Sequence, residues 1–138
     1  MIFGIGCDTC WIPHLEKSLT GPHAAAFVRR VYGPEEAQQL DLAQPLPEGR
    51  PGAHRLASAA ANFAAKEAFL KAAGTGLREP FALRDIQALR LENGAPVYRF
   101  SGASAQWMQQ RGLQAHLSLS HDGGMALAFC VLEAPGES

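Results

Sequence analysis

The sequence predicts a single α+β domain in which a mainly antiparallel sheet packs against a long central helix. Its 138 residues match the usual size of one domain. Helical patterns lie mostly in the first half of the chain and strand patterns in the second, which favours α+β over a doubly wound α/β fold. We expect the domain to span residues 1–133 and residues 134–138 to form a C-terminal tail.

The first element is a predicted strand at residues 2–8. Alternation places Ile5 and Cys7 on one face of this strand and Asp8 on the other, together with two glycines. We expect the face that carries Cys7 to point toward the core.

Three short helices and a surface loop follow this strand. The third helix begins at Pro34, because a proline in the first turn is followed by two acidic residues. Three prolines and two glycines between residues 44 and 54 predict a surface loop. The predicted helices cover residues 12–19, residues 24–32, and the stretch from Pro34 to before Pro45.

The strongest helical pattern is the Ala- and Leu-rich stretch at residues 57–73, and Gly74 is expected to end it. The Asn93-Gly94 pair is typical of a hairpin turn, in which both residues adopt positive φ. Residues 121–124 are turn-forming, and weak alternation in the last strand predicts burial on both of its faces. The remaining elements are strands at residues 85–91, 97–100, 113–120 and 125–133, with a helix at 103–111 that Gly112 ends.

Composition excludes several classes of protein. With 47% hydrophobic and 18% charged residues, the chain is too apolar to be a disordered linker. A net charge of −1 lacks the surplus of Lys and Arg that binding to nucleic acid requires, so we expect no nucleic-acid partner. No apolar run approaches the ~20 residues that cross a bilayer, and the first residues lack signal-peptide features. Three cysteines cannot complete a disulfide framework, which indicates reduced thiols. From these observations together we expect a cytoplasmic protein without membrane contact.

Two carboxylates lie in apolar elements, where an unpaired negative charge is unfavourable. Helical spacing places Glu67 beside Phe63 and Leu70 on an apolar face, where an unpaired charge loses much of its hydration energy. An ion pair with Lys71 four residues later would satisfy it without any function. Asp8 ends an apolar strand and either caps the residues that follow or meets Glu67. Two converging carboxylates form an oxygen site of the kind that binds Mg²⁺ together with phosphates.

Three motifs, in this order, resemble those of the holo-acyl-carrier-protein synthases. They are GIGCD at residues 4–8, NFAAKEAFLKAAGTG at residues 62–76 and LSLSHD at residues 117–122. FVRRVYGPEE at residues 27–36 and NGAP at residues 93–96 also match, so the resemblance covers nearly the whole chain.

The resemblance implies a phosphopantetheinyl transferase-like fold and a magnesium enzyme. Such an enzyme transfers the phosphopantetheine arm of coenzyme A to a serine of an apo acyl carrier protein and releases adenosine 3',5'-bisphosphate. Asp8 and Glu67 map to the acids that hold the metal in this family. The resemblance also implies a homotrimer with active sites between subunits.

Within this resemblance we assign roles to individual side chains. We expect Glu67 to accept the serine proton, directly or through water, and Lys71 and His121 to complete the catalytic set. Lys66 and Lys71 would meet coenzyme phosphates, and the glycines after the long helix would let the coenzyme approach the backbone. The expected substrate-binding residues are Lys66, Lys71, Gly74, Thr75, Gly76, Asn93, Pro96, Ser118, Ser120 and His121.

Two departures from the family leave a second function open. His14 and Asn62 stand where the family usually carries arginine. Each lost charge-assisted contact could cost about 1.5–3 kcal/mol, although Lys17, Arg29 or Arg30 could compensate. The alternative is a catalytically weak homologue that binds coenzyme A or a carrier protein without turnover.

A C-x-x-C string, Cys7 to Cys10, offers an alternative of another class. It could indicate a zinc or thiol-redox domain. Zinc would require a second pair of ligands, and a redox motif belongs at the start of a helix, so we favour a structural role for both cysteines.

Overall fold

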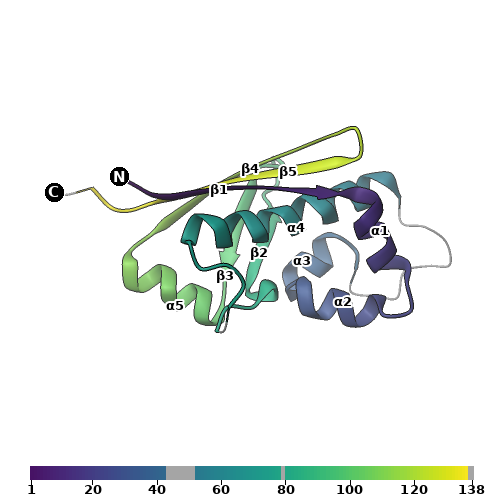
Figure 1. Cartoon of the computed structure of the whole chain (residues 1–138), viewed down its shortest axis with the longest axis horizontal. Coiled ribbons are helices and arrows are strands. Elements are labelled where there is room, and N and C mark those ends of the chain that lie inside the picture. The colour runs from purple at the N-terminus through teal and green to yellow at the C-terminus, as the bar shows by residue number, and fades with distance from the viewer. Residues whose placement is uncertain (43–51, 79, 137–138) are drawn as a thin grey trace.

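The fold combines two antiparallel sheets with a long central helix, and the computed structural model describes residues 1–42, 52–78 and 80–136. Its strands are β1 (Ile2–Trp11), β2 (Ile86–Arg90), β3 (Pro96–Phe100), β4 (Gln114–Asp122) and β5 (Met125–Glu133). Its helices are α1 (Ile12–Thr20), α2 (Ala24–Val31), α3 (Pro34–Gln39), α4 (Ala53–Ala73) and α5 (Gly102–Arg111), with a 3₁₀ helix at Leu83–Asp85. Three strands pair in the order β1-β5-β4, and β2 pairs with β3. The predicted α+β fold is confirmed (Figure 1).

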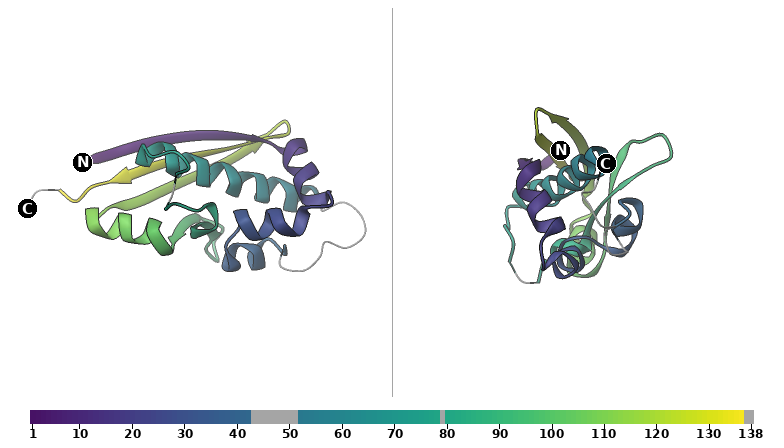
Figure 2. Two further views of the ribbon diagram at one scale, coloured as in Figure 1. Left: turned by 60° about the horizontal axis from the view of Figure 1, so that its bottom comes forward. Right: turned by 90° about the vertical axis from the view of Figure 1, so that its right-hand side faces the viewer.

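Helix α4 lies at the centre of the molecule. The three-stranded sheet covers one side of it, α1, α2 and α3 gather at one end, and α5 lies toward the other end (Figure 2). Thirteen of its 21 residues are buried, so α4 contacts neighbours on nearly every side. Within the described ranges, no helix is long and apolar enough to cross a membrane.

Strand β1 packs directly on α4 because its glycines face the helix. A Cβ at Gly6 would overlap the carbonyl oxygen of Ala68, and Gly4 makes an equally close approach one turn further along α4. The alternation predicted for this strand is present, but the faces are reversed. Ile5 is 58% exposed and Gly6 is buried. A strand can approach a helix backbone this closely only where it carries no side chain.

Replacing Gly6 with alanine should destabilise the protein by ~1–3 kcal/mol, because the added methyl group meets helix backbone that cannot move aside. Thermal denaturation of the variant measures the loss. Gly52→Ala is the matched control, since a Cβ there meets nothing within 4 Å and the Tm should hardly change. Equal Tm values for the two variants would contradict the close packing of β1 on α4.

The three-stranded sheet buries one face and exposes the other. In β5, residues alternate between full burial against α4 and exposure. The prediction that this strand is buried on both faces is therefore wrong: its outward residues are apolar as well, which hides the alternation. We call the exposed side the outer sheet face; its large apolar residues are Ile5, Trp11, Met125, Leu127 and Phe129.

Side chains form hydrogen bonds with the backbone of β2 along the edge that faces away from β3. The backbone N–H and carbonyl groups of Ala88 and Arg90, and the carbonyl of Ile86, all have side-chain partners at 2.7–3.1 Å. These partners come from α3 and α4: Glu36, Gln39, Asn62 and Lys66. This edge therefore docks onto helices instead of onto another strand.

Most elements lie close to their predicted positions, and the differences concern their ends. Gly74 and Gly112 end α4 and α5 with φ values of 77° and 61°, as predicted. β1 continues to Trp11, three residues past its predicted end. α4 begins at Ala53, inside the predicted surface loop, most of which lies outside the described residues.

The two hairpin turns differ from the prediction in different ways, because the first is shorter and the second has fewer residues with positive φ. β4 extends to Asp122, so His121 and Asp122 are strand residues and only Gly123 and Gly124 remain between the strands. In the turn between β2 and β3, Gly94 has a positive φ but Asn93 does not. A single glycine suffices there, because Asn93 accepts a side-chain hydrogen bond from the N–H of Ala95 at 3.0 Å.

Candidate functional site

Two carboxylates lie close together on facing elements. Asp8 projects from β1 toward α4, and Glu67 projects from α4 near β1. Both side chains are partly buried. Burial raises the pKa of Glu67 above its usual value, and the nearby negative charge of Asp8 raises it further. The two acids therefore interact across the contact between β1 and α4.

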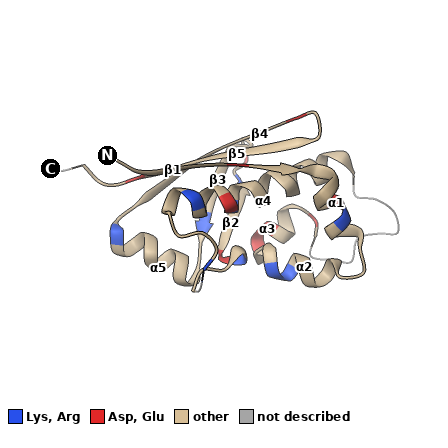
Figure 3. Ribbon diagram, in the orientation of Figure 1, with Lys and Arg blue, Asp and Glu red and all other residues tan. Residues whose placement is uncertain are grey.

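Lys71 forms an ion pair with Asp8. Its Nζ lies 2.9 Å from Oδ1 of Asp8 and donates a second hydrogen bond to the carbonyl of Cys7 at 3.1 Å. The Lys71 side chain is 56% exposed, so the pair lies open to solvent on one side. Figure 3 shows basic and acidic positions next to one another on this part of α4. Asp8 raises the pKa of Lys71 and is its main partner, in place of the predicted pair with Glu67.

Lys66 does not face these acids, and its expected role as a phosphate ligand conflicts with its position. Its side chain is fully buried, and the ammonium pairs with Glu36 and donates to the carbonyls of Leu83 and Ile86 at 3.0 and 2.7 Å. All three of its N–H donors are therefore engaged inside the core. Successive helix residues point about 100° apart, which separates Lys66 from Glu67.

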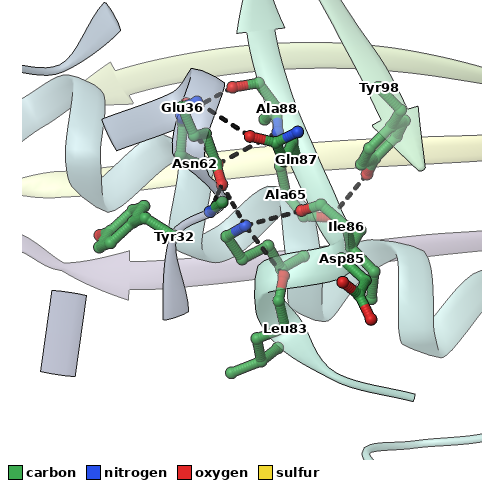
Figure 4. A network of polar contacts seen from close by, with 12 residues as sticks. Tyr32, Glu36, Asn62, Ala65, Leu83, Asp85, Ile86, Gln87, Ala88 and Tyr98 are labelled. Atoms are coloured by element: carbon green, nitrogen blue, oxygen red, sulfur yellow. Dashed lines mark hydrogen bonds and ion pairs between the residues drawn. The ribbon is translucent and has the colours of Figure 1, made fainter. Parts of the chain in front are cut away.

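Glu36 is the centre of a buried polar network (Figure 4). One carboxylate oxygen accepts hydrogen bonds from Lys66 and from the N–H of Gly33; the other accepts them from Asn62 and from the N–H of Ala88. Burial raises the pKa of Glu36, while Lys66 and the hydrogen bonds lower it. Sequence reasoning did not find this network. The available signal was an acid three residues after Gly33, which forms the capping box of α3.

Asn62, one of the two departures from the family, lies inside this network. It is 1% exposed, and its Nδ2 donates to Glu36 at 3.1 Å and to the carbonyl of Ala88 at 2.9 Å. Its Oδ1 has no hydrogen-bond partner among the residues that the structure describes. The neutral amide of Asn62 thus donates hydrogen bonds to Glu36 and Ala88 at a position where the family usually carries a charged arginine.

Gly74, Thr75 and Gly76 form the turn after α4, close in sequence to Lys71. Gly74 and Gly76 have φ values of 77° and 61°, and a Cβ at either would meet nothing within 4 Å. The hydroxyl of Thr75 donates to the carbonyl of Gly76 at 3.0 Å. The backbone of this turn is therefore open to a ligand.

The remaining expected substrate residues do not gather around the carboxylates within one chain. Ser118 and Ser120 pair with Phe129 and Leu127, so they belong to the outer sheet face. His121 pairs with Ala126 and points to the opposite face of β4, where it is exposed. A strand alternates its side chains, so adjacent residues such as Ser120 and His121 cannot share one face.

Asn93 and Pro96 lie on the other sheet, at the hairpin between β2 and β3. Asn93 is exposed in the turn, and Pro96 pairs with Arg90 at the start of β3. Neither is hydrogen-bonded to Asp8 or Glu67 within the described chain.

The C-x-x-C cysteines do not form a joint site. Their spacing places Cys7 on the exposed outer face and Cys10 on the opposite side of β1, which corrects the expectation that Cys7 faces the core. Burial raises the pKa of Cys10 to about 11, so this thiol stays protonated near neutral pH. Across the described ranges, no group of three or more His, Cys, Asp or Glu residues could hold a metal ion.

Comparison with known proteins identifies the family. The model of the 4'-phosphopantetheinyl transferase superfamily matches residues 4–130. The chain is 40% identical over 136 residues to the holo-[acyl-carrier-protein] synthase of Trichlorobacter lovleyi, covering 98% of this chain and all of the relative. It is 40% identical over 142 residues to that of Myxococcus xanthus, covering 99% of this chain and 98% of the relative.

Solved structures agree with these sequence matches. The holo-[acyl-carrier-protein] synthase of Neisseria meningitidis superposes with a TM-score of 0.78 at 31% identity, covering 96% of this chain and 99% of the other. The Bacillus anthracis enzyme, in complex with CoA (3',5'-ADP), gives a TM-score of 0.75 at 30% identity over 98% of this chain and 99% of the other. The chain belongs to the holo-[acyl-carrier-protein] synthase family within the 4'-phosphopantetheinyl transferase superfamily.

Proposed function

We propose that this protein transfers the 4'-phosphopantetheine arm of coenzyme A to a serine of an apo acyl carrier protein. The other product is adenosine 3',5'-bisphosphate. The observation that carries the proposal is the proximity of Asp8 and Glu67, at the positions that match the family's metal acids, in a chain similar to holo-[acyl-carrier-protein] synthases over its whole length.

The two acids suit Mg²⁺. This ion takes one or two protein carboxylates and completes its coordination with water and substrate phosphates, so it needs no third protein ligand. Asp8 and Glu67 would hold the ion, and their hard oxygen atoms exclude a preference for softer metals. When bound, Mg²⁺ neutralises negative charge on the phosphates and on the leaving oxygen.

Glu67, Lys71 and His121 divide the remaining work. The serine oxygen attacks the phosphorus that carries the pantetheine arm, and the bond to adenosine 3',5'-bisphosphate breaks. We assign the serine proton to Glu67, directly or through water, because this carboxylate lies beside Asp8, where the metal ion and the phosphates would be held. Lys71, on the exposed side of α4, would contact the coenzyme phosphates. His121 remains the second candidate for orienting phosphate.

We further propose that copies of the chain assemble through the outer sheet face, in the trimer that the resemblance implies. Leu127 and Phe129 are 38% and 40% exposed there, and contiguous apolar surface of this kind favours association. Ser118 and Ser120 lie on the same face. Assembly would place them near a neighbouring chain, which explains why one chain does not bring them to its own acids.

Phe129→Glu should reduce the assembly to a monomer of 14.8 kDa, because it places a charge in the middle of the outer sheet face. Size-exclusion chromatography with light scattering gives the mass. Leu91→Glu, at an exposed leucine of the β2–β3 turn, is the control and should keep the wild-type mass. An unchanged mass for Phe129→Glu would reject this face as the interface.

The transferase activity is tested by incubating the protein with an apo carrier protein, coenzyme A and Mg²⁺ and then weighing the carrier by intact mass spectrometry. We expect the carrier to gain the phosphopantetheine arm, and to gain nothing when a chelator removes the metal. If several candidate carriers stay unmodified although coenzyme A binds, the alternative of a binding module without turnover is favoured.

We also propose a cytoplasmic location. Cys7, Cys10 and Cys130 are all free, which agrees with a reducing compartment.

A further inference from the structure

We propose that Lys71 is an internal counter-ion that competes with the divalent cation for Asp8, and that its release links cation binding to coenzyme binding. The inference rests on the proposed function, because it concerns the same pair of acids. Its starting point is that the ammonium contacts the side chain that would ligate the metal, at 2.9 Å from Oδ1.

Two hydrogen bonds fix where this ammonium lies. Besides Asp8, it binds the carbonyl oxygen of the preceding residue, Cys7, at 3.1 Å. The Nζ atom is therefore held against β1, directly beside the carboxylate. Mg²⁺ binds carboxylate oxygen at about 2.0–2.1 Å, so an ion on Asp8 would lie within a few ångströms of the ammonium. Two cations this close repel each other, and the approach of one favours the departure of the other.

The pair can also be broken at low cost. More than half of the Lys71 side chain is exposed, and water replaces the lost hydrogen bonds as the ammonium leaves. Lys66, five residues earlier on the same helix, shows the opposite case, since burial and three hydrogen bonds hold it in place. Of these two lysines of α4, Lys71 is therefore the one that can change partners.

Lys71 has a second destination within reach. It lies in the last turn of α4, next to the open turn at Gly74 to Gly76, and its four-carbon chain is flexible. A phosphate bound near this turn would attract the ammonium away from Asp8. Cation binding and phosphate binding then favour each other, and each raises the affinity of the other by the same factor.

The test measures Mn²⁺ binding to the full chain by electron paramagnetic resonance, first without any nucleotide. Lys71→Met removes the charge and should bind Mn²⁺ about fivefold more tightly than wild type, as expected for the loss of an exposed ion pair. Lys71→Arg keeps the charge and should bind like wild type. Arg111→Gln removes one positive charge from the end of α5 and should also bind like wild type.

The second arm adds adenosine 3',5'-bisphosphate as the probe. In the wild type it should tighten Mn²⁺ binding, and in Lys71→Met this gain should be smaller, because no ammonium is left to move and only the phosphate oxygens that bind the ion directly contribute. Unchanged or weaker Mn²⁺ binding by Lys71→Met without nucleotide, or an equal gain in both proteins, would overturn the inference.

A further variant separates this inference from the proposed metal site. Asp8→Asn should weaken Mn²⁺ binding in every condition. If it does not, the metal site and the inference both fail. If Asp8→Asn weakens binding but Lys71→Met does not tighten it, the metal site stands and only the competition is rejected.

Discussion

Asp8→Ala and Glu67→Gln should each lower the rate of phosphopantetheine transfer roughly 10²- to 10³-fold. The reason is that a bound metal ion contributes several kcal/mol to such a reaction, and the site offers these two carboxylates to hold it. Neither side chain belongs to the buried core, so both variants should fold. Initial rates with saturating apo carrier protein, measured over a series of Mg²⁺ concentrations, give the size of the loss.

An acid outside the site supplies the control for these variants. Glu35 is exposed on α3 and pairs with Arg99 at 2.9 Å. Glu35→Gln removes the same charge and should keep the wild-type rate. Near-normal turnover by Asp8→Ala or Glu67→Gln, with an unchanged circular dichroism spectrum, would reject the assignment of these two acids.

A second large effect is expected for Lys66→Met, which should lower the free energy of unfolding by about 3–5 kcal/mol. The substitution leaves the carboxylate of Glu36 buried without its cation, and such an uncompensated charge is among the most destabilising changes in a protein core. It also removes the donor for the carbonyls of Leu83 and Ile86. Denaturation with guanidinium chloride measures the loss.

Lys71→Met is the matched control, because it makes the same change on the same helix at an exposed position. Its unfolding free energy should hardly change, because the ion pair lies open to solvent. The double variant Glu36→Gln with Lys66→Met removes both charges and should regain part of the lost stability. If Lys66→Met does not accumulate as folded protein, the double variant is measured in its place. Equal stability of the two lysine variants would mean that Lys66 is not the structural residue that its burial indicates.

The fold class and most elements were predictable because their signals are local. The Ala-rich pattern of α4, the glycines that end α4 and α5, and the turn residues between strands each act within a few positions. The faces of β1 were not predictable in this way. Whether Gly6 or Ile5 turns inward depends on the backbone of α4, more than 60 residues away in sequence.

The candidate site was predictable only in part, for the same physical reason. Asp8 and Glu67 could be selected because carboxylates in apolar elements need a partner and because their motifs match a family. The position of Lys66 could not be read from the motif. Nearly all sides of α4 are covered, and the partner of Lys66, Glu36, comes from a separate helix 30 residues earlier. Ser118 and Ser120 lie on the outer sheet face, so nothing within the described chain places them beside the two acids.

The helix-bonded edge of β2 has a consequence for how this protein avoids misassembly. An exposed strand edge recruits further strands, and repeated strand addition is the first step toward cross-β fibrils. On β2, the amide and carbonyl groups of Ala88 and Arg90 are already occupied by Glu36, Gln39 and Asn62. An incoming strand would have to displace these side chains one by one. The small sheet is thereby protected from polymerisation at this edge.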